Sequence, residues 1–479
     1  MLKFNFSKYF WLALTATFFC AAQSNAAAQT GKPPIIIIPG ITGSQMVNSE
    51  TGEKVWFTLS RADTDDLRLP MSPNLAKNRD KLVATDIIRE IKLPSILPDI
   101  QIYGTALASL EAKGYTEATW DNPQATDVFY VFAYDWRRDN VESAQELFRK
   151  IEAVKTRLKR PDLKFDIVAH SMGGLIARYA AMYGAADLPM SGRTPVPSWA
   201  GAKHIRRIFL FGTPNEGSFG AFTALIKGYT LGGRNLPFID DLTKDDVFTI
   251  PSLFQLMPFR GTGRFLNEDL KPINVDIYRA ETWTKYGWGA LSNPRFLSKL
   301  KDAAKIKGIK PVKEQKIKTI DDQILADTTY SEARRYLTVV LSRAQQFQAA
   351  LGVKIKNAPV ETLVYGSDCK ATLDAIILVK NEKTNSWRTI TKPDAFKTST
   401  GRKVSAEEIK KAIYAPGDGR VPEHSLLANS TLKSSNGQIV KASYSTAQPL
   451  FFCEPHETLL NNKDIEDNFL VTLLKEILK

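Results

Sequence analysis

Residues 165–184 (FDIVAHSMGGLIARYAAMYG) combine residue types that suit nucleophilic chemistry. A buried-strand pattern ends at Ala169, one polar residue separates it from Ser171, and Gly173 and Gly174 open a helical pattern. This order is typical of a tight strand-to-helix turn that raises a serine hydroxyl above a sheet and needs small residues two positions before and after it. Ala169 and Gly173 occupy those positions. We predict that Ser171 is a nucleophile. The alternative is an ordinary turn whose glycines serve only helix packing.

A nucleophilic serine needs a general base, and the chain has four histidines. In α/β-hydrolases the base follows the serine and the acid in the sequence. His456 lies in the loop CEPHETLL before a C-terminal helical pattern, so it is the predicted base. His424 is expected to be a structural or gating neighbour, and His204 is expected to be structural. His170 precedes the nucleophile directly, and we expect the turn to point it away.

The acid that orients the base has two candidates. Asp418 lies in a Pro-Gly-Asp-Gly loop, although Asp-Gly is also a common turn dipeptide. Asp368 lies just beyond a strand pattern that ends at Tyr365. This is also a position where α/β-hydrolases carry the acid. We favour Asp418 and keep Asp368 as the alternative.

Acyl transfer also needs backbone N–H groups that face the developing oxyanion. The amide of Met172, directly after the nucleophile, is one predicted donor. The amide of Ile41, behind the Pro-Gly bend of IIPGITGS, is the other. No metal-ligand spacing occurs in the sequence, and we expect no metal and no cofactor.

Strand and helix patterns alternate along the chain and predict an α/β fold with a mainly parallel central sheet flanked by helices. Strands are predicted at 35–38, 128–133, 165–169, 205–211 and 361–365, and helices at 103–113 and 141–158. We expect an α/β-hydrolase core in two parts, 33–217 and 348–479, with a cap or lid insertion at 218–347.

Several motifs in this order resemble the lecithin:cholesterol acyltransferase family. They are IIPGITGSQM, TGEKVWF, IYGTALASLEAKGYTEAT, FAYDWRRDN, FGTPNEGS, PSLFQLMP, GDGRVPEHSL and HETLL, spread over residues 33–460. The Tyr-Asp-Trp-Arg stretch, which includes Tyr134 and Trp136, and the acid loop are the more specific ones. The resemblance covers most of the chain after residue 33.

The resemblance implies that Ser171, Asp418 and His456 form a triad that attacks an acyl ester of a glycerophospholipid. The acyl group then passes through an acyl-serine to water or another alcohol. Tyr134 and Trp136 are expected to contact the lipid substrate. Since FGTPNEGS also resembles bacterial triacylglycerol lipases, a triacylglycerol lipase or carboxylesterase with the same triad is the alternative.

The composition describes a globular chain: 479 residues, 43% hydrophobic and 24% charged, with 64 Lys and Arg against 51 Asp and Glu. The resulting charge of +13 comes with no nucleic-acid recognition motif, so no nucleic-acid partner is expected. The basic run 299–318 near Trp283, Tyr286 and Trp288 suits peripheral docking on a lipid surface, or else is a solvated basic face. The apolar stretch 93–100 is expected to be an interfacial loop or core. No pattern defines an oligomeric state.

Residues 1–28 have the layout of a cleavable signal peptide, with Lys3 and Lys8 before an apolar run and small residues after it. We therefore expect a secreted or periplasmic protein. Cys369 and Cys453 remain after cleavage. In an oxidising compartment they form a disulfide or else are two buried thiols, and the sequence does not favour one over the other.

Overall fold

The computed structural model of the chain describes residues 31–58, 67–92, 99–189, 193, 195–230, 242–259, 264–311, 319–353, 358–428, 431–433, 439–441 and 449–475. The expected signal peptide and most of the apolar stretch 93–100 lie outside these residues, and so does part of the basic run 299–318.

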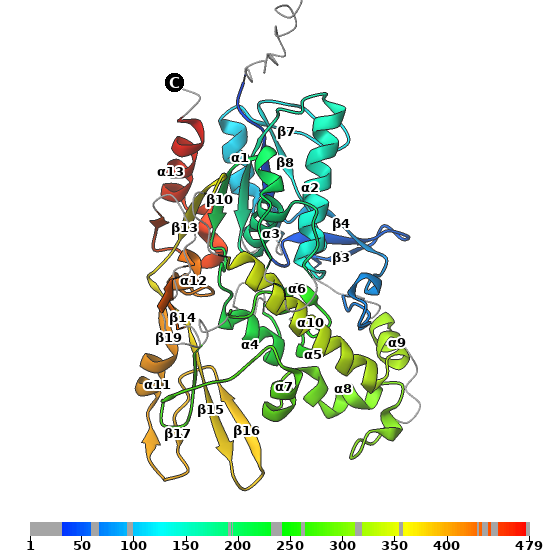
Figure 1. Cartoon of the computed structure of the whole chain (residues 1–479), viewed down its shortest axis with the longest axis vertical. Coiled ribbons are helices and arrows are strands. Elements are labelled where there is room, and N and C mark those ends of the chain that lie inside the picture. Colours follow the sequence, from blue (N-terminus) through cyan, green and yellow to red (C-terminus); the bar gives the residue numbers. More distant parts are fainter. Residues whose placement is uncertain are drawn as a thin grey trace, which may run out of the picture.

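The largest sheet of the described residues has seven strands and lies in the upper half of the molecule as drawn in Figure 1. Its strand order is β22-β13-β10-β9-β1-β8-β7, and every neighbouring pair is parallel. The strands are β1 (Ile35–Ile38), β7 (Thr116–Glu117), β8 (Val128–Val131), β9 (Phe165–His170), β10 (Ile205–Phe211), β13 (Glu361–Gly366) and β22 (Leu450–Phe451). The five strands predicted from the sequence are confirmed, with ends shifted by at most two residues.

Helices cover both faces of this sheet because its central strands are apolar on both sides. Along β1, Ile36 and Ile38 pack in the larger core cluster with α2 (Asn140–Arg157) and α3 (Met172–Tyr183). The alternate residues Ile35 and Ile37 pack in a second cluster with α1 (Gly104–Ala112) and α13 (Lys463–Leu474). The two predicted helices, α1 and α2, are confirmed. A sheet between two helical layers follows from this alternation.

Further helices lie beyond the sheet's carboxyl edge, in the segment expected to be a cap (Figure 1). They are α4 (Phe219–Lys227), α5 (Lys244–Val247), α6 (Pro251–Phe254), α7 (Ala280–Tyr286), α8 (Pro294–Lys299), α9 (Ile320–Asp327) and α10 (Tyr330–Leu351). A capping box formed by Thr329 and Glu332 starts α10. The domain boundaries themselves stay a prediction.

The aromatic cluster of this segment is not available to a lipid surface. Trp283, Tyr286 and Trp288 are buried and pack against one another and against Phe222, whose ring centre lies 4.8 Å from that of Trp288. The expectation that these rings help to dock the protein on a lipid surface is wrong, because they fill the core of the helical segment.

A second sheet joins this segment to residues beyond 347. Its order is β12-β11-β15-β16, formed by β11 (Arg264–Leu266), β12 (Pro272–Ile273), β15 (Ala375–Asn381) and β16 (Ser386–Ile390). With α11 (Ala406–Ile413) it encloses a small separate core. Figure 1 shows this sheet at the end of the molecule opposite β7 and β8.

The remaining elements are short. They are the strands β2 (Ser44–Asn48), β3 (Lys54–Trp56), β4 (Leu82–Ile87), β5 (Glu90–Ile91), β6 (Ile100–Gln101), β14 (Lys370–Leu373), β17 (Phe396–Lys397), β18 (Lys403–Val404), β19 (Tyr414–Gly417), β20 (Thr431–Lys433) and β21 (Ile439–Lys441), the helix α12 (Glu423–Leu427), and the 3-10 helices η1 (Leu75–Lys77), η2 (Ala200–Lys203), η4 (Ala290–Ser292), η5 (Ala303–Lys305) and η6 (His456–Asn461).

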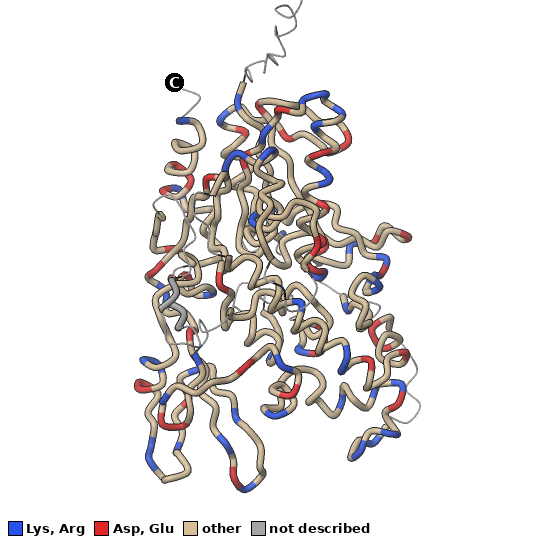
Figure 2. The backbone as a smooth tube through the Cα atoms, in the orientation of Figure 1, with Lys and Arg blue, Asp and Glu red and all other residues tan. Residues whose placement is uncertain are grey.

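Charges of both signs alternate along the outer helices and loops (Figure 2). In the described part of the basic run, Lys299 forms an ion pair with Asp322 at 3.0 Å. Among the helices of the described ranges, none is both long enough and apolar enough to cross a bilayer. Contact with a lipid surface stays a prediction.

A disulfide joins Cys369, after β13, to Cys453, after β22, with a Cα–Cα distance of 5.4 Å. Of the two alternatives left open by the sequence, the structure has the bonded one. The cross-link closes a sequence separation of 84 residues that contains the Asp418 loop, and it lies three positions before His456.

Replacing both cysteines by serine is expected to lower the free energy of unfolding by about 2–5 kcal/mol, because the unfolded chain regains the freedom of a long loop. Denaturant unfolding of the wild type and of the C369S/C453S variant measures this difference. Dithiothreitol should destabilise the wild type equally and leave the variant unchanged. Equal midpoints for oxidised wild type and variant would contradict the prediction.

Candidate active site

The turn between β9 and α3 holds Ser171 in a strained backbone conformation, with φ 52° and ψ −123°. Such a conformation is rare outside glycine and persists only where the surroundings enforce it. A Cβ atom on Gly173 would lie 2.5 Å from the Pro39 carbonyl oxygen, so the strand β1 side of the turn has no room for a larger residue. Ala169 is fully buried. The predicted strand-to-helix turn is therefore present, with its small residues in place.

Ser171, His456 and Asp418 form one hydrogen-bonded chain. The Ser171 hydroxyl lies 2.9 Å from His456 Nε2, and His456 Nδ1 lies 2.7 Å from Asp418 Oδ2. The other carboxylate oxygen, Oδ1, accepts from the amides of Arg420 (2.9 Å) and Val421 (2.7 Å). The carboxylate is 1% exposed and the other two residues are 7% exposed. The three residues predicted from the sequence are thus brought together in the expected order.

The acid loop also fixes the backbone of the histidine. The His456 amide donates to the Asp418 carbonyl oxygen at 2.9 Å. Burial alone lowers the pKa of His456, but the adjacent Asp418 carboxylate together with Glu457 raises the pKa above its usual value. An imidazole with a raised pKa is a stronger base, and the cation that forms when it accepts a proton is stabilised by the carboxylate behind it.

The other acid and two other histidines lie elsewhere. Asp368 is exposed at the end of β13 and is not the carboxylate that contacts His456. His204 is buried against the Phe148 ring at 4.9 Å. His424 Nε2 lies 2.7 Å from the carboxylate of Asp374, and its structural or gating role stays a prediction. In the described part of the chain, no three His, Cys, Asp or Glu side chains gather as metal ligands would.

The backbone of β10 makes room for the histidine ring. Gly212 directly follows this strand, has φ 62°, and a Cβ atom there would lie 2.9 Å from His456 Nδ1. The imidazole of His456 therefore lies against bare main chain, and a side chain at residue 212 would displace it.

The serine opens into a cavity of about 1140 Å³, part of which is open to solvent. Much of its wall is aliphatic, and Ser171 and His456 both line it. The larger aliphatic lining side chains are those of Ile41, Ile88, Ile91, Ile100, Ile102, Leu253, Leu256 and Val421. Arg420 and Glu457 line the same cavity and bind each other, with Nε 2.7 Å from Oε1. The cavity suits an apolar chain attached to a polar group.

The predicted oxyanion donors lie beside the serine. Ile41 lines the cavity within the segment 39–43, called here the oxyanion turn, and Met172 is the first residue of α3. Within the described residues, neither amide donates a hydrogen bond to another group of the chain. The first N–H groups of a helix have no intrahelical partner, so the Met172 amide is free to bind an anion.

Three aromatic side chains from distant segments hold the oxyanion turn. Tyr103 accepts from the Gly40 amide at 2.8 Å, Tyr134 donates to the Pro39 carbonyl at 3.0 Å, and Trp56 Nε1 donates to the Thr42 carbonyl at 2.9 Å. The sequence analysis missed this role, although Trp56, Tyr103 and Tyr134 all lie in motifs that it singled out.

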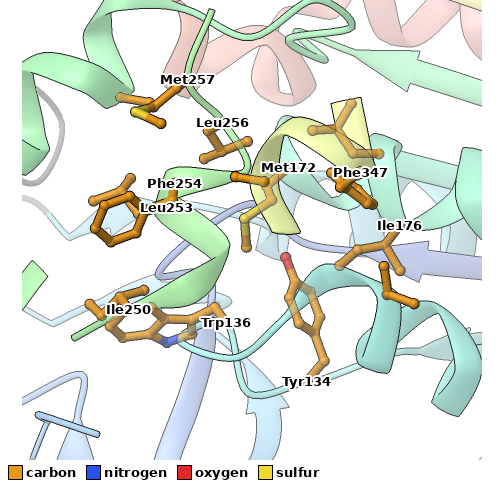
Figure 3. Packing of buried hydrophobic residues seen from close by; sticks show 14 of the residues in the cluster. Tyr134, Trp136, Met172, Ile176, Ile250, Leu253, Phe254, Leu256, Met257 and Phe347 are labelled. Carbon is orange, nitrogen blue, oxygen red and sulfur yellow. The ribbon is translucent and has the colours of Figure 1, made fainter. Parts of the chain in front are cut away.

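The expectation that Tyr134 and Trp136 contact the substrate is wrong. Both side chains are buried and neither lines the cavity. Figure 3 shows them in the core, among residues of α3 and α6. The Tyr-Asp-Trp-Arg stretch is structural: Arg137 is fully buried and pairs with Asp80 (2.6 Å) and Asp135 (2.8 Å).

The expectation that the turn points His170 away is also wrong. Its ring lines the cavity, its Nδ1 lies 3.0 Å from the Tyr103 hydroxyl, and its Nε2 lies 3.1 Å from the His456 carbonyl oxygen. His170 is the last residue of β9, and the alternation of side chains along that strand puts it on the face of Val168, opposite to Ala169.

Comparisons with known proteins bear on the family and the fold of the chain. The sequence profile of the lecithin:cholesterol acyltransferase family matches residues 84–451. No curated protein sequence matches the chain. Among solved structures, a crystal structure of the Tle4–Tli4 complex superimposes with a TM-score of 0.52 at 15% identity and covers 93% of this chain and 99% of that one. This likeness shows a shared fold, the α/β-hydrolase fold that the sequence predicted.

Two further structures show weaker likeness. EstA from Clostridium botulinum has a TM-score of 0.29 at 12% identity, with 92% of this chain and 86% of that one covered. Lipase BlEst2 from Bacillus licheniformis has a TM-score of 0.20 at 16% identity, with 41% and 46% covered.

His424 generates a prediction on the pH dependence of stability. Burial alone lowers the pKa of His424, but its contacts with Asp374 and Glu216 raise it to about 9. The protonated ring therefore stabilises the fold fully below the unfolded pKa of about 6.5, and this contribution is lost as the pH rises through 9. We expect the difference in unfolding free energy between wild type and H424Q to shrink from pH 6 to pH 10, as measured by denaturant titration. A difference independent of pH would contradict the ion pair.

Proposed function

Because the chain belongs to the lecithin:cholesterol acyltransferase family, we propose that it is an enzyme that cleaves an acyl ester of a glycerophospholipid and passes the acyl group to water or another alcohol. The observation that carries this proposal is the hydrogen-bonded chain from Ser171 through His456 to Asp418 at an apolar cavity.

In the proposed reaction the Ser171 oxygen attacks the ester carbonyl carbon while His456 Nε2 takes the hydroxyl proton. Asp418 stabilises the imidazolium that forms. The negative charge on the carbonyl oxygen is stabilised by the amides of Ile41 and Met172, and each such donor contributes about 3–4 kcal/mol to lowering the barrier. His456 returns the proton to the leaving glycerol oxygen, and an acyl-serine remains.

The second half repeats these steps with an incoming hydroxyl. His456 takes a proton from water or an alcohol, the oxygen of that molecule attacks the acyl-serine, and Ser171 is released with its proton restored. The aliphatic wall of the cavity supports an acyl chain as the bound group, since each methylene buried there contributes about 0.8 kcal/mol.

Arg420 favours a phospholipid over a neutral ester. Its guanidinium carries five N–H donors, of which Nε binds Glu457 and Nη2 lies 3.3 Å from the Thr230 carbonyl. A guanidinium that lines the cavity beside the triad suits a phosphate, which takes paired, charge-assisted hydrogen bonds. The second candidate, a lipase or esterase on neutral substrates, is favoured by the aliphatic character of the remaining wall.

We also propose that the protein is exported. Residues 1–28 have the layout of a signal peptide, and disulfides such as that between Cys369 and Cys453 persist in oxidising compartments.

Replacing Ser171 by alanine should abolish the activity, because the acyl-serine cannot form. We expect kcat on a soluble p-nitrophenyl ester to fall by at least about 10⁴-fold. A fluorophosphonate probe should label the wild type and not S171A. The control is S109A, a serine on α1 outside the cavity, which should behave as wild type. Wild-type activity in folded S171A would refute the proposed mechanism.

Replacing Arg420 by glutamine tests the head group. Loss of a charge-assisted contact to phosphate should lower kcat/KM on phosphatidylcholine vesicles about 10-fold and change that on p-nitrophenyl butyrate less than about twofold. The matched control is R295Q, which removes an exposed arginine of α8. Equal losses on both substrates would mean that Arg420 serves the triad instead. A wild type active on neutral esters alone would favour the second candidate.

A further inference from the structure

We infer that Tyr103 and His170 form a positioning pair that sets the distance between the oxyanion turn and the histidine loop, here residues 452–456. The pair joins the two halves of the site by a route separate from the triad. The inference rests on the proposed function only in taking Ser171 as the nucleophile.

The pair makes three consecutive hydrogen bonds between the two segments. The Gly40 amide donates to the Tyr103 hydroxyl oxygen at 2.8 Å. The Tyr103 hydroxyl and His170 Nδ1 lie 3.0 Å apart, and His170 Nε2 lies 3.1 Å from the carbonyl oxygen of His456. The backbone of the residue before Ile41 is thereby linked to the backbone of the predicted base.

The direction of each hydrogen bond follows from the groups at the two ends of the series, the His456 carbonyl oxygen and the Gly40 amide. A carbonyl oxygen only accepts, so His170 Nε2 carries the hydrogen. In a neutral imidazole the other nitrogen then accepts, so the Tyr103 hydroxyl donates to Nδ1. The hydroxyl oxygen is left to accept from the Gly40 amide, which only donates. Every donor of this chain has one acceptor, and one tautomer of His170 fits.

This series of three hydrogen bonds requires an uncharged His170. Burial, together with the neighbouring ring of His456, lowers the pKa of His170 to about 4, although Glu457 and Asp418 act in the opposite direction. A protonated ring would donate from both nitrogens, and the Tyr103 hydroxyl hydrogen would then have no acceptor in this chain. Burial thus keeps the ring in the state that the geometry demands.

The separation that this pair sets is the one on which the proposed reaction depends. The Ile41 amide has to face the oxyanion while His456 Nε2 faces the serine oxygen, and a misplacement of about 1 Å can cost about 10²-fold in rate. Tyr103 precedes α1 and His170 ends β9, so both come from elements fixed in the core. They act through other residues and are positioning residues.

The test compares Y103F, H170L, H170Q and the double variant Y103F/H170L in the full-length protein. On p-nitrophenyl butyrate we expect Y103F and H170L each to lower kcat about 10- to 100-fold with KM changed less than about twofold. H170Q should retain most of the activity, because the amide offers both an acceptor and a donor. The double variant should lose no more than the worse single one, because the two residues act as one unit.

The control for Y103F is Y115F. Tyr115 is buried in the same core cluster, and its hydroxyl has no hydrogen-bond partner among the described residues, so its removal should leave kcat unchanged. Thermal unfolding identifies folded variants. Y103F removes one oxygen atom and keeps the ring, so it decides the test if H170L does not fold.

Wild-type kcat in folded Y103F, or additive losses in the double variant, would overturn the inference. The rate of fluorophosphonate labelling separates this failure from that of the proposed function. A wild type that is not labelled refutes the nucleophile. Equal labelling rates for wild type and Y103F refute only the positioning pair.

Discussion

The hydrogen bond between Ser171 and His456 joins residues 285 positions apart, and the arrangement of the site depends on it. The serine is held at the end of a central strand by a backbone conformation that its neighbours enforce. The histidine is held by the Asp418 carboxylate and carbonyl, and its loop is tethered by the Cys369–Cys453 bond. Sheet, acid loop and disulfide therefore serve one contact of 2.9 Å.

Features governed by local sterics could be predicted from the sequence. The apolar strand runs, the small residues around Ser171 and the order of serine, acid and histidine predicted the fold and the three central side chains. The choice between Asp418 and Asp368 depended on which loop folds back onto His456, and only the spatial arrangement shows that the former is buried there and the latter exposed.

Outside the triad, contacts between distant segments could not be predicted from the sequence. Tyr134 and Trp136 lie in a conspicuous motif, but both side chains are buried in the core. Tyr134 contributes to the site by its hydrogen bond to the Pro39 carbonyl oxygen. His170 adjoins the serine, but no sequence pattern indicates that its ring lies between the Tyr103 hydroxyl and the His456 carbonyl. Trp283 and Trp288 suggested a lipid-facing surface, but the assembled helices bury both rings. Whether a side chain is exposed depends on how the helices pack, which the local sequence does not determine.

The absence of a side chain at Gly212 limits the mobility of the His456 ring. The His456 ring rests on this backbone on one side and is held by Asp418 on another, so few orientations remain to it. The loss of ring mobility is incurred once, when the protein folds, and is not repeated in each catalytic cycle. An imidazole already immobilised in this way exchanges protons between two oxygen atoms with little rearrangement around it.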